Sequence, residues 1–392
     1  MSTPFALDRG QRDWCAELRA LAAGRLRPLA DKGEPGRVNR PLVATLGELG
    51  LLARLLPADG SVRAMDLCLL RESLALESTE AETALALQGL GTYPIVDAGT
   101  ATQRARWLPE VVAGRAVSAF ALSEPGAGSD AAALELRAER AGPAWRLTGE
   151  KCWISNAPEA DLYTVFARTG PAPGARGVTA FLVPADRPGL GGRPLAMVSP
   201  HPIGTLTFDA VPVGPDDVIG EVGGGFRVAM RTLDLFRPSV GAFAVGMARS
   251  ALRAALAHAA GRHAFGGPLK NLQAVSHQLA EMATRTEAAA LLVHAAAAAY
   301  DAGEPGTAGR SAMAKLFATE TAQYVVDAAV QIHGARALER GHLLEHLYRE
   351  VRAPRIYEGA TEVQRTIIAK ELYRAAAAEG ATAPMSTREP GR

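Results

Sequence analysis

Hydrophobic residues recur at every third or fourth position through the first part of the chain, from about residue 11 to residue 116. Leu42, Leu46 and Leu49 show this spacing, which places apolar side chains on one face of a helix. The same period predicts one long helix over 63–87. A break is expected at 91–95, where glycine and proline stand close together. This part of the chain is therefore expected to form a helical domain.

Past residue 116 the period changes to two, which is typical of strands. The strand-like runs are separated by glycine and proline, and they lie at 117–122, 145–147, 162–167, 178–183 and 206–211. From residue 225 the helical period returns and continues to about 374, with breaks at 262–269, at 303–309 and at Gly341. Four long helices of bundle type fit this interval.

These patterns predict an α+β fold that is mainly helical. We expect an N-terminal helical domain, a central β-barrel-like domain, a C-terminal four-helix bundle and a flexible tail rich in small residues. The expected boundaries of these four parts are 1–116, 117–224, 225–374 and 375–392.

Composition narrows the range of partners. The 392 residues include 42 Lys and Arg against 41 Asp and Glu, so the net charge is +1 and no nucleic-acid partner is expected. The first residues do not resemble a signal peptide, and no uninterrupted apolar run has the length of a bilayer span. Cys15, Cys68 and Cys152 are widely spaced and odd in number, as free thiols in a reducing compartment would be. We therefore expect a cytoplasmic protein with no membrane partner.

One carboxylate is a candidate for proton transfer. Glu358 stands beside Gly359 and before Thr361 and Gln364, which have the spacing of a capping box and predict a helix that begins at Thr361. Glu358 would then lie in a turn, where neighbouring bulky residues at 356 and 357 could shield it from water. Such shielding raises the pKa of a carboxylate toward the working pH of a general base. The alternative is an ordinary solvated turn glutamate.

Two further runs have the character of ligand-binding segments. Residues 120–130 follow a strand, and their glycines allow a ligand to approach the backbone while Ser123 and Ser129 offer hydroxyl donors. The run lacks the Walker lysine and the dinucleotide fingerprint, so it could hold a phosphate or a polar ring edge, or be a β-turn without a ligand. In the second run Trp153 comes two residues before Ser155. A flat ring beside a donor suits a flavin, and the alternative is a core tryptophan.

A third pattern concerns metals. His342, Glu345 and His346 fit the inverted zinc-protease motif. No third ligand follows at a suitable spacing, and histidine pairs on polar helix faces are common. No metal site is predicted.

Two of these runs together resemble the acyl-CoA dehydrogenase family. ALSEPGAGSD at 121–130 is similar to the central motif of the family, and IYEG at 356–359 is similar to the motif that carries its catalytic base. Shorter similarities occur at 91–95, 262–266 and 271–274, and the resemblance covers nearly the whole chain to Arg374.

The resemblance implies FAD, bound noncovalently at a subunit interface of a homotetramer or dimer. Ser123 and Ser155 would bond the isoalloxazine edge, Trp153 would lie against the ring, and Arg262 would pair with the diphosphate. The other FAD contacts implied are Phe120, Leu122, Ile154, Phe265, Gln273, Gln331, His333, Gly334, Ala335, Ala360 and Glu362. Of these, the residues at 331–335 would reach the FAD of a neighbouring subunit.

The resemblance also implies the reaction. The substrate would be an acyl-CoA, or the thioester of an acyl carrier protein, contacted by Ser129, Asp234, Arg237, Tyr357 and Gly359. Glu358 would remove the α-proton while flavin N5 accepts the β-hydride, giving a trans-2-enoyl thioester. The thioester carbonyl would accept hydrogen bonds from the backbone amide of Glu358 and from a ribityl hydroxyl. An electron-transfer flavoprotein would receive the electrons.

Some relatives carry the base at the position of Phe236, which cannot accept a proton here, so Glu358 is the expected base. The chain departs from the family pattern at Ala335 and Ala360, where backbone contacts with FAD are expected. It also departs over 199–204 and 56–60, where substrate entry could be reshaped, and for this reason we predict no acyl length. The alternatives are an acyl-CoA oxidase or another oxygen-reactive flavoenzyme on the same fold, and a noncatalytic scaffold.

Overall fold

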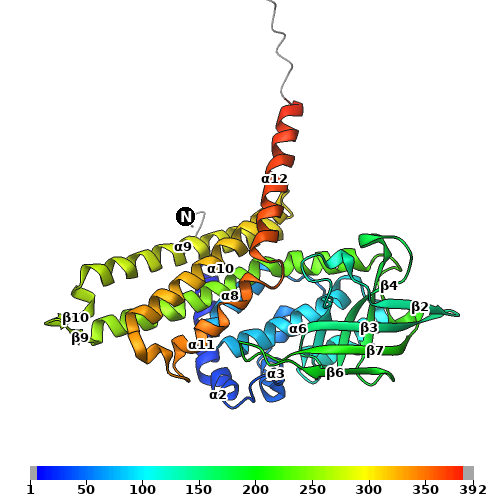
Figure 1. Cartoon of the computed structure of the whole chain (residues 1–392), viewed down its shortest axis with the longest axis horizontal. Helices are drawn as coiled ribbons and strands as arrows, with labels where there is room; N and C mark the ends of the chain where they lie inside the picture. The colour runs from blue at the N-terminus through cyan, green and yellow to red at the C-terminus, as the bar shows by residue number, and fades with distance from the viewer. Residues whose placement is uncertain (1–6, 383–392) are drawn as a thin grey trace, which may run out of the picture.

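The computed structural model describes residues 7–382. Figure 1 shows a β-sheet at one end of the molecule and long bundle helices at the other, with helix α6 (Thr79–Ala98) between them. Helix α6 contacts both strand β1 and helix α8, so it joins the two ends into one body.

The N-terminal part is helical, as expected. Its helices are α1 (Arg9–Leu21), a π-helical turn (Ala22–Leu26), α2 (Arg27–Ala30), α3 (Arg40–Glu48), α4 (Leu51–Leu55), α5 (Ala64–Ala75), α6 and α7 (Ala101–Val112). The single helix expected over 63–87 is wrong. Two helices share that interval, because the Ser78 hydroxyl accepts a hydrogen bond from the Ala81 amide at 3.2 Å and caps the start of α6.

The break expected at 91–95 is also wrong. Helix α6 runs through these residues with Pro94 inside it. Gly91 serves a different purpose, because a Cβ at this position would lie 2.6 Å from the Ala119 amide nitrogen on β1. The glycine therefore allows helix and strand to approach closely instead of ending the helix.

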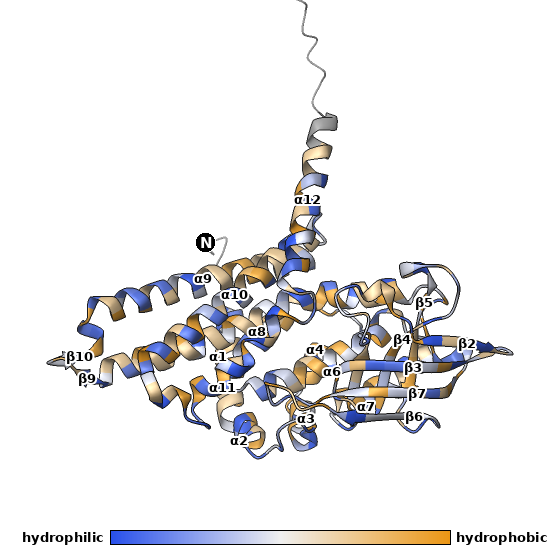
Figure 2. Cartoon of the chain, in the orientation of Figure 1, coloured by the Kyte–Doolittle hydropathy of each residue, from blue (hydrophilic) through white to orange (hydrophobic). Residues whose placement is uncertain are grey.

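The central part is one sheet. Its strands are β1 (Ser118–Ala121), β2 (Arg137–Ala141), β3 (Ala144–Ser155), β4 (Leu162–Arg168), β5 (Val178–Pro184), β6 (Leu190–Pro194), β7 (Ile203–Val213) and β8 (Val218–Ile219). They follow the order β6-β7-β3-β2-β4-β5-β8, and β1 pairs in parallel with β4. Over residues 7–382 this path is open, so the sheet is not a closed barrel. Strands β4 and β5 are buried along nearly their whole length, whereas the outer tip of β2 is hydrophilic (Figure 2).

The C-terminal part is a helix bundle. Its helices are α8 (Gly225–Gly261), α9 (Gln273–Asp301), α10 (Thr307–His333), α11 (Leu343–Glu350) and α12 (Thr361–Thr382), and a small hairpin of β9 (His263–Ala264) and β10 (Gly267–Pro268) follows α8. Helix α12 extends through 375–382, and the rest of the expected tail lies outside the described residues. Between residues 7 and 382 there are also six 3-10 turns: Ala131–Ala133, Gly174–Gly177, Pro215–Asp217, Leu269–Asn271, Gly334–Leu338 and Ala353–Arg355.

Helix α8 is long and apolar enough to cross a membrane by length and composition alone. However, 67% of its most apolar window is buried inside the protein. It packs against α5, α9 and α10, which is the environment of a core helix in a bundle. The packing within the protein therefore accounts for its apolar character.

Candidate active site

Glu358 lies in a left-handed turn between the 3-10 turn at Ala353–Arg355 and helix α12. Its φ is +50° and that of Gly359 is +91°, a region that L-residues rarely adopt and that costs a non-glycine residue about 1 kcal/mol. The expected acid in a turn, followed by a helix that begins at Thr361, is confirmed.

The expected capping box is wrong. Thr361 is the first residue of α12, and its hydroxyl donates to Glu320 Oε1 at 2.9 Å. Gln364 reaches back to the turn instead, where its Nε2 donates to the Gly359 carbonyl at 2.8 Å. The turn is therefore held from inside the protein and not by reciprocal capping.

The carboxylate of Glu358 is not a solvated turn glutamate. Its Oε2 atom is buried and accepts no hydrogen bond from any residue in the described range. Burial raises the pKa of Glu358, and the positive charges of Arg71, Lys315 and Arg237 oppose that rise. Tyr357 is partly buried, whereas Ile356 is 57% exposed, so the expected shielding by Ile356 is wrong. The walls of the bundle supply the shielding.

Sequence reasoning missed a buried ion pair behind the turn. Arg71 on α5 donates through Nε to Glu82 on α6 and through Nη1 to Ser239 on α8, the latter at 2.8 Å. Arg71 is 3% exposed and Glu82 is 0% exposed. The pKa of Arg71 is raised despite burial, because Glu82 and Glu358 stabilise its charge. The sequence signal for this pair is weak: Arg71 directly follows the apolar residues Leu69 and Leu70 in α5.

Two further cations lie near Glu358. Lys315 on α10 is fully buried, and burial lowers the pKa of its ammonium to about 8. Its Nζ donates to the Gly359 carbonyl at 2.7 Å.

Arg237 on α8 donates through Nη1 to Asp234 at 2.7 Å, while its Nε is buried without a partner among the described residues. The structure therefore brings Asp234 and Arg237 together beside Tyr357, Glu358 and Gly359. Ser129 is exposed in the loop after β1.

The end of β3 presents a flat aromatic surface. Trp153 has a φ of +56° and is 50% exposed, so the alternative of a core tryptophan is wrong. The Cys152 amide donates to the Ser123 carbonyl at 3.0 Å, which places the loop after β1 beside this strand. The hydroxyls of Ser123 and Ser155 bond no described residue. An exposed indole with two unpartnered hydroxyls nearby fits the edge and face of a flavin.

A second buried ion pair supports that loop. Lys151 Nζ contacts Glu124 Oε1 at 2.7 Å and donates to the Leu122 carbonyl at 2.8 Å. Phe120 packs on the Phe166 ring with centroids 4.9 Å apart. The side chains of Leu122 and Ile154 are buried in the core, so only their backbones are available to a ligand.

The other expected cofactor residues lie elsewhere. Arg262 and Phe265 are exposed beside the β9–β10 hairpin, Phe265 by 90%, and Figure 1 shows this hairpin at the end of the bundle away from the sheet. His333 stacks on His258 of α8, with ring centroids 4.1 Å apart. The remaining residues near this end are Gln273, Gln331, Gly334 and Ala335, all exposed. One chain therefore does not bring this group to Trp153. Ala360 directly precedes α12, and Glu362 is the second residue of that helix.

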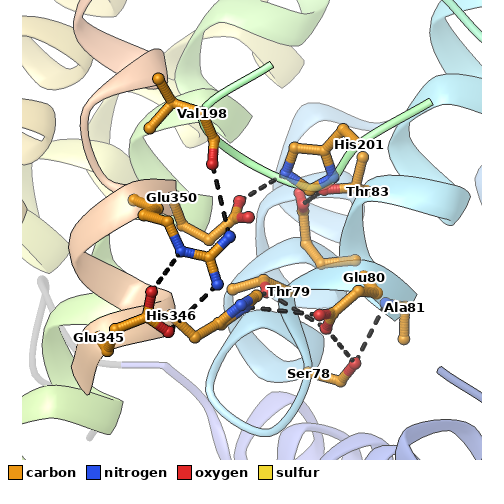
Figure 3. A network of polar contacts seen from close by, with 12 residues as sticks. Ser78, Thr79, Glu80, Ala81, Thr83, Val198, His201, Glu345, His346 and Glu350 are labelled. Carbon is orange, nitrogen blue, oxygen red and sulfur yellow. Dashed lines mark hydrogen bonds and ion pairs between the residues drawn. The ribbon is translucent and has the colours of Figure 1, made fainter. Parts of the chain in front are cut away.

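A polar network joins the start of α6, helix α11 and the loop before β7 (Figure 3). His201 Nε2 contacts Glu350 Oε2 at 2.5 Å, and Arg349 donates to Glu345 at 2.7 Å. A cavity of about 610 Å³ opens beside these residues, lined also by Thr83 and His346. Sequence reasoning missed the His201–Glu350 pair.

The two histidines of the inverted zinc-protease pattern have structural contacts. His342 caps α11 by accepting from the Leu344 amide at 3.1 Å, and His346 contacts the Thr79 hydroxyl at 2.6 Å. Over residues 7–382 no group of three or more possible metal-ligating side chains occurs.

Comparison with known proteins identifies the family of the chain. The models of the acyl-CoA dehydrogenase N-terminal, middle and C-terminal domains match residues 8–115, 119–211 and 223–373. A probable acyl-CoA dehydrogenase of Mycobacterium leprae is 36% identical over 377 residues, covering 94% of this chain and 97% of that protein. The mitochondrial short-chain specific acyl-CoA dehydrogenase of Rattus norvegicus is 38% identical over 341 residues, covering 85% and 82%. The structure of butyryl-CoA dehydrogenase from Megasphaera elsdenii matches with a TM-score of 0.88 at 31% identity, covering 95% of this chain and 100% of that chain. The chain is an enzyme of the acyl-CoA dehydrogenase family.

Proposed function

We propose that this enzyme converts an acyl thioester of coenzyme A, or of an acyl carrier protein, into the trans-2-enoyl thioester, with Glu358 as the base and FAD as the cofactor. One observation carries the proposal: Glu358 Oε2 is a buried carboxylate oxygen that accepts no hydrogen bond from the described residues. Such an oxygen is available to take a proton from carbon.

The environment of Glu358 suits this role. A thioester α-hydrogen is a weak acid, so the base gains from a pKa raised by burial. The turn holds the side chain in place before the substrate arrives, which is an orientation effect. The backbone N–H of Glu358 also bonds no described residue. It is therefore available to donate to the thioester carbonyl and to stabilise the developing negative charge on its oxygen.

The chain also offers residues that would hold FAD. Trp153 would lie against the ring, and Ser123 and Ser155 would donate to its edge. When bound, FAD supplies the acceptor for the hydride that leaves the β-carbon as the α-proton moves to Glu358, and the electrons of the α C–H bond form the new double bond. Arg262 is exposed and directly precedes the β9–β10 hairpin, which lies at the end of the bundle away from the sheet (Figure 1). It would therefore meet the diphosphate of FAD in a second copy of the chain. We therefore propose a homotetramer or dimer, with an electron-transfer flavoprotein as the acceptor of the electrons.

The test is an anaerobic titration of the purified yellow protein with butyryl-CoA and with a panel of longer, branched and cyclic acyl thioesters. At least one thioester should bleach the flavin of the wild type. The variant Glu358→Gln should retain FAD and lose the bleaching. Full bleaching of that variant would exclude Glu358 as the base, and a protein that neither contains nor takes up FAD would refute the proposed function. Rapid recolouring in air with peroxide formation would indicate an oxidase.

A further inference from the structure

The carbonyl oxygen of Gly359 accepts two hydrogen bonds from two different helices. Lys315 on α10 donates from Nζ at 2.7 Å, and Gln364 on α12 donates from Nε2 at 2.8 Å. Both donors therefore fix the residue next to Glu358 in its left-handed conformation. One donor carries a charge and the other does not, so the two contributions can be separated by experiment.

Two of the cations around Glu358 form ion pairs with other carboxylates, whereas Lys315 and Glu358 themselves form none among the described residues. Arg71 is bonded to Glu82 and Arg237 to Asp234. Lys315 forms no ion pair within 4.0 Å in the described chain, and its hydrogen bond goes to a carbonyl. Glu358 is likewise without a bonded cation. A buried charge without a partner is unfavourable, so Lys315 and Glu358 are complementary groups.

The surroundings of Lys315 support this pairing. Burial lowers the pKa of Lys315 and the charge of Glu358 is the largest influence that raises it, ahead of Glu320 on the same helix and Glu362 on α12. Arg237 on α8 acts in the opposite direction. Glu358 in turn faces Arg71, Lys315 and Arg237 from α5, α10 and α8. Of these three cations, only Lys315 also bonds the turn that carries Glu358.

We propose that Lys315 is a positioning residue for the oxidation of the acyl thioester. Its ammonium holds the Glu358 turn through the Gly359 carbonyl and adds to the positive charges of Arg71 and Arg237 that keep Glu358 ionised until the α-proton arrives. After proton transfer Glu358 is neutral and Lys315 is unchanged, so the step needs no further reactant. This role rests on the proposed function, because it assumes that Glu358 is the base.

A matched pair of variants separates charge from hydrogen bonding. Lys315→Met removes both the charge and the bond to Gly359, whereas Gln364→Met removes only the bond. The measurement is an infrared titration of the Glu358 carboxyl in the FAD-bound enzyme, with the Glu358→Gln form of each protein as background. The pKa of Glu358 should rise by about one unit or more in Lys315→Met, and by much less in Gln364→Met. An unchanged pKa in Lys315→Met would overturn the proposal.

Two further measurements cover other outcomes. If Lys315→Met does not hold FAD, Lys315→Arg should restore both the flavin and the wild-type titration, and a shifted Glu358 pKa in Lys315→Arg would count against the role of the charge. In the wild type itself, the Glu358 carboxylate band should change as Lys315 loses its proton near pH 8. A band that is constant through that range would also overturn the proposal. These titrations need no substrate, so they test the role of Lys315 independently of the reaction. A flavin that no acyl thioester bleaches would refute the proposed function but would leave the titration result unaffected.

Discussion

Arg71 and Glu82 form an ion pair between α5 and α6 that is almost completely removed from water, at 3% and 0% exposure. Burial raises the pKa of Glu82, and Arg71 opposes that rise. Both residues also act on the pKa of Tyr357, the neighbour of the proposed base: burial and Glu82 raise it, and Arg71 opposes the rise. A buried ion pair of this kind contributes little net stability by itself, but the loss of one partner leaves an uncompensated charge in the core.

Replacing one partner should therefore be costly. We expect Glu82→Gln to lower the free energy of unfolding by about 3 kcal/mol or more, because Arg71 loses its anion while it stays buried. Urea denaturation of the FAD-bound enzyme measures this change. The double variant Arg71→Met/Glu82→Leu, which removes both charges, should recover most of the loss. A double variant as unstable as Glu82→Gln would show that packing, and not the unpaired charge, causes the effect.

The His201–Glu350 pair predicts a pH-dependent contribution to stability. Burial acts to lower the pKa of His201, but Glu350, Glu80 and Glu82 raise it above its ordinary value of 6.5 overall. Burial acts to raise the pKa of Glu350, but His201, His346 and Arg349 lower it below 4.5 overall. A raised histidine pKa stabilises the fold below 6.5 and this contribution is lost as pH rises through the folded value. A lowered glutamate pKa stabilises above 4.5 and this contribution is lost at lower pH.

The two requirements overlap between pH 4.5 and 6.5. The difference in Tm between wild type and His201→Gln should be largest in that window and should shrink above it. Thermal unfolding monitored by circular dichroism at several pH values tests this expectation. A difference that grows from pH 6.5 to pH 9 would contradict a charged His201.

Replacing Arg262 should weaken the binding of FAD. Its guanidinium is exposed at the end of α8, where a second copy of the chain would bring a diphosphate. Arg262→Ala should weaken FAD binding by about tenfold or more, because hydrogen bonds between charged groups are worth about 1.5–3 kcal/mol. The flavin content after gel filtration measures the loss. Arg227→Ala, at the other end of α8, is the control, and equal flavin content in both variants would exclude the diphosphate contact.

The periods of hydrophobic residues predicted the helical, sheet and bundle parts because each period follows from local backbone geometry. Glu358 could be located in a turn because the helix was expected to begin at Thr361, as it does, and Gly359 stands between the two. Gly91 was misread because glycine marks both a helix break and a close approach, and only the contact with Ala119 distinguishes them. Ile356 was expected to shield the carboxylate, but its direction depends on the left-handed turn that follows.

The charged residues around Glu358 could not be found in the same way. Lys315 and Gly359 are 44 positions apart, and neither position has a local pattern that indicates the other. Charged residues on helices are mostly exposed, so Arg71 and Lys315 would ordinarily be assigned to the surface. Their burial follows from the packing of α5, α8 and α10 against each other, which no short stretch of sequence determines.

The pH dependence of catalysis should follow the ionisation of Glu358 and of Lys315. The proposed base must be ionised, so kcat/KM should rise with a single carboxylate whose pKa lies above the ordinary 4.5 of glutamate, since burial raises the pKa of Glu358. At the alkaline side kcat/KM should fall as Lys315 loses its proton near pH 8, because a neutral amine bonds the Gly359 carbonyl more weakly than an ammonium does and holds the Glu358 turn less firmly. Initial rates with the most active thioester and a dye acceptor, taken from pH 5 to pH 10, measure both limbs. Lys315→Met should lack the alkaline limb and show its acid limb at higher pH. An alkaline limb that persists in this variant would assign it to another group.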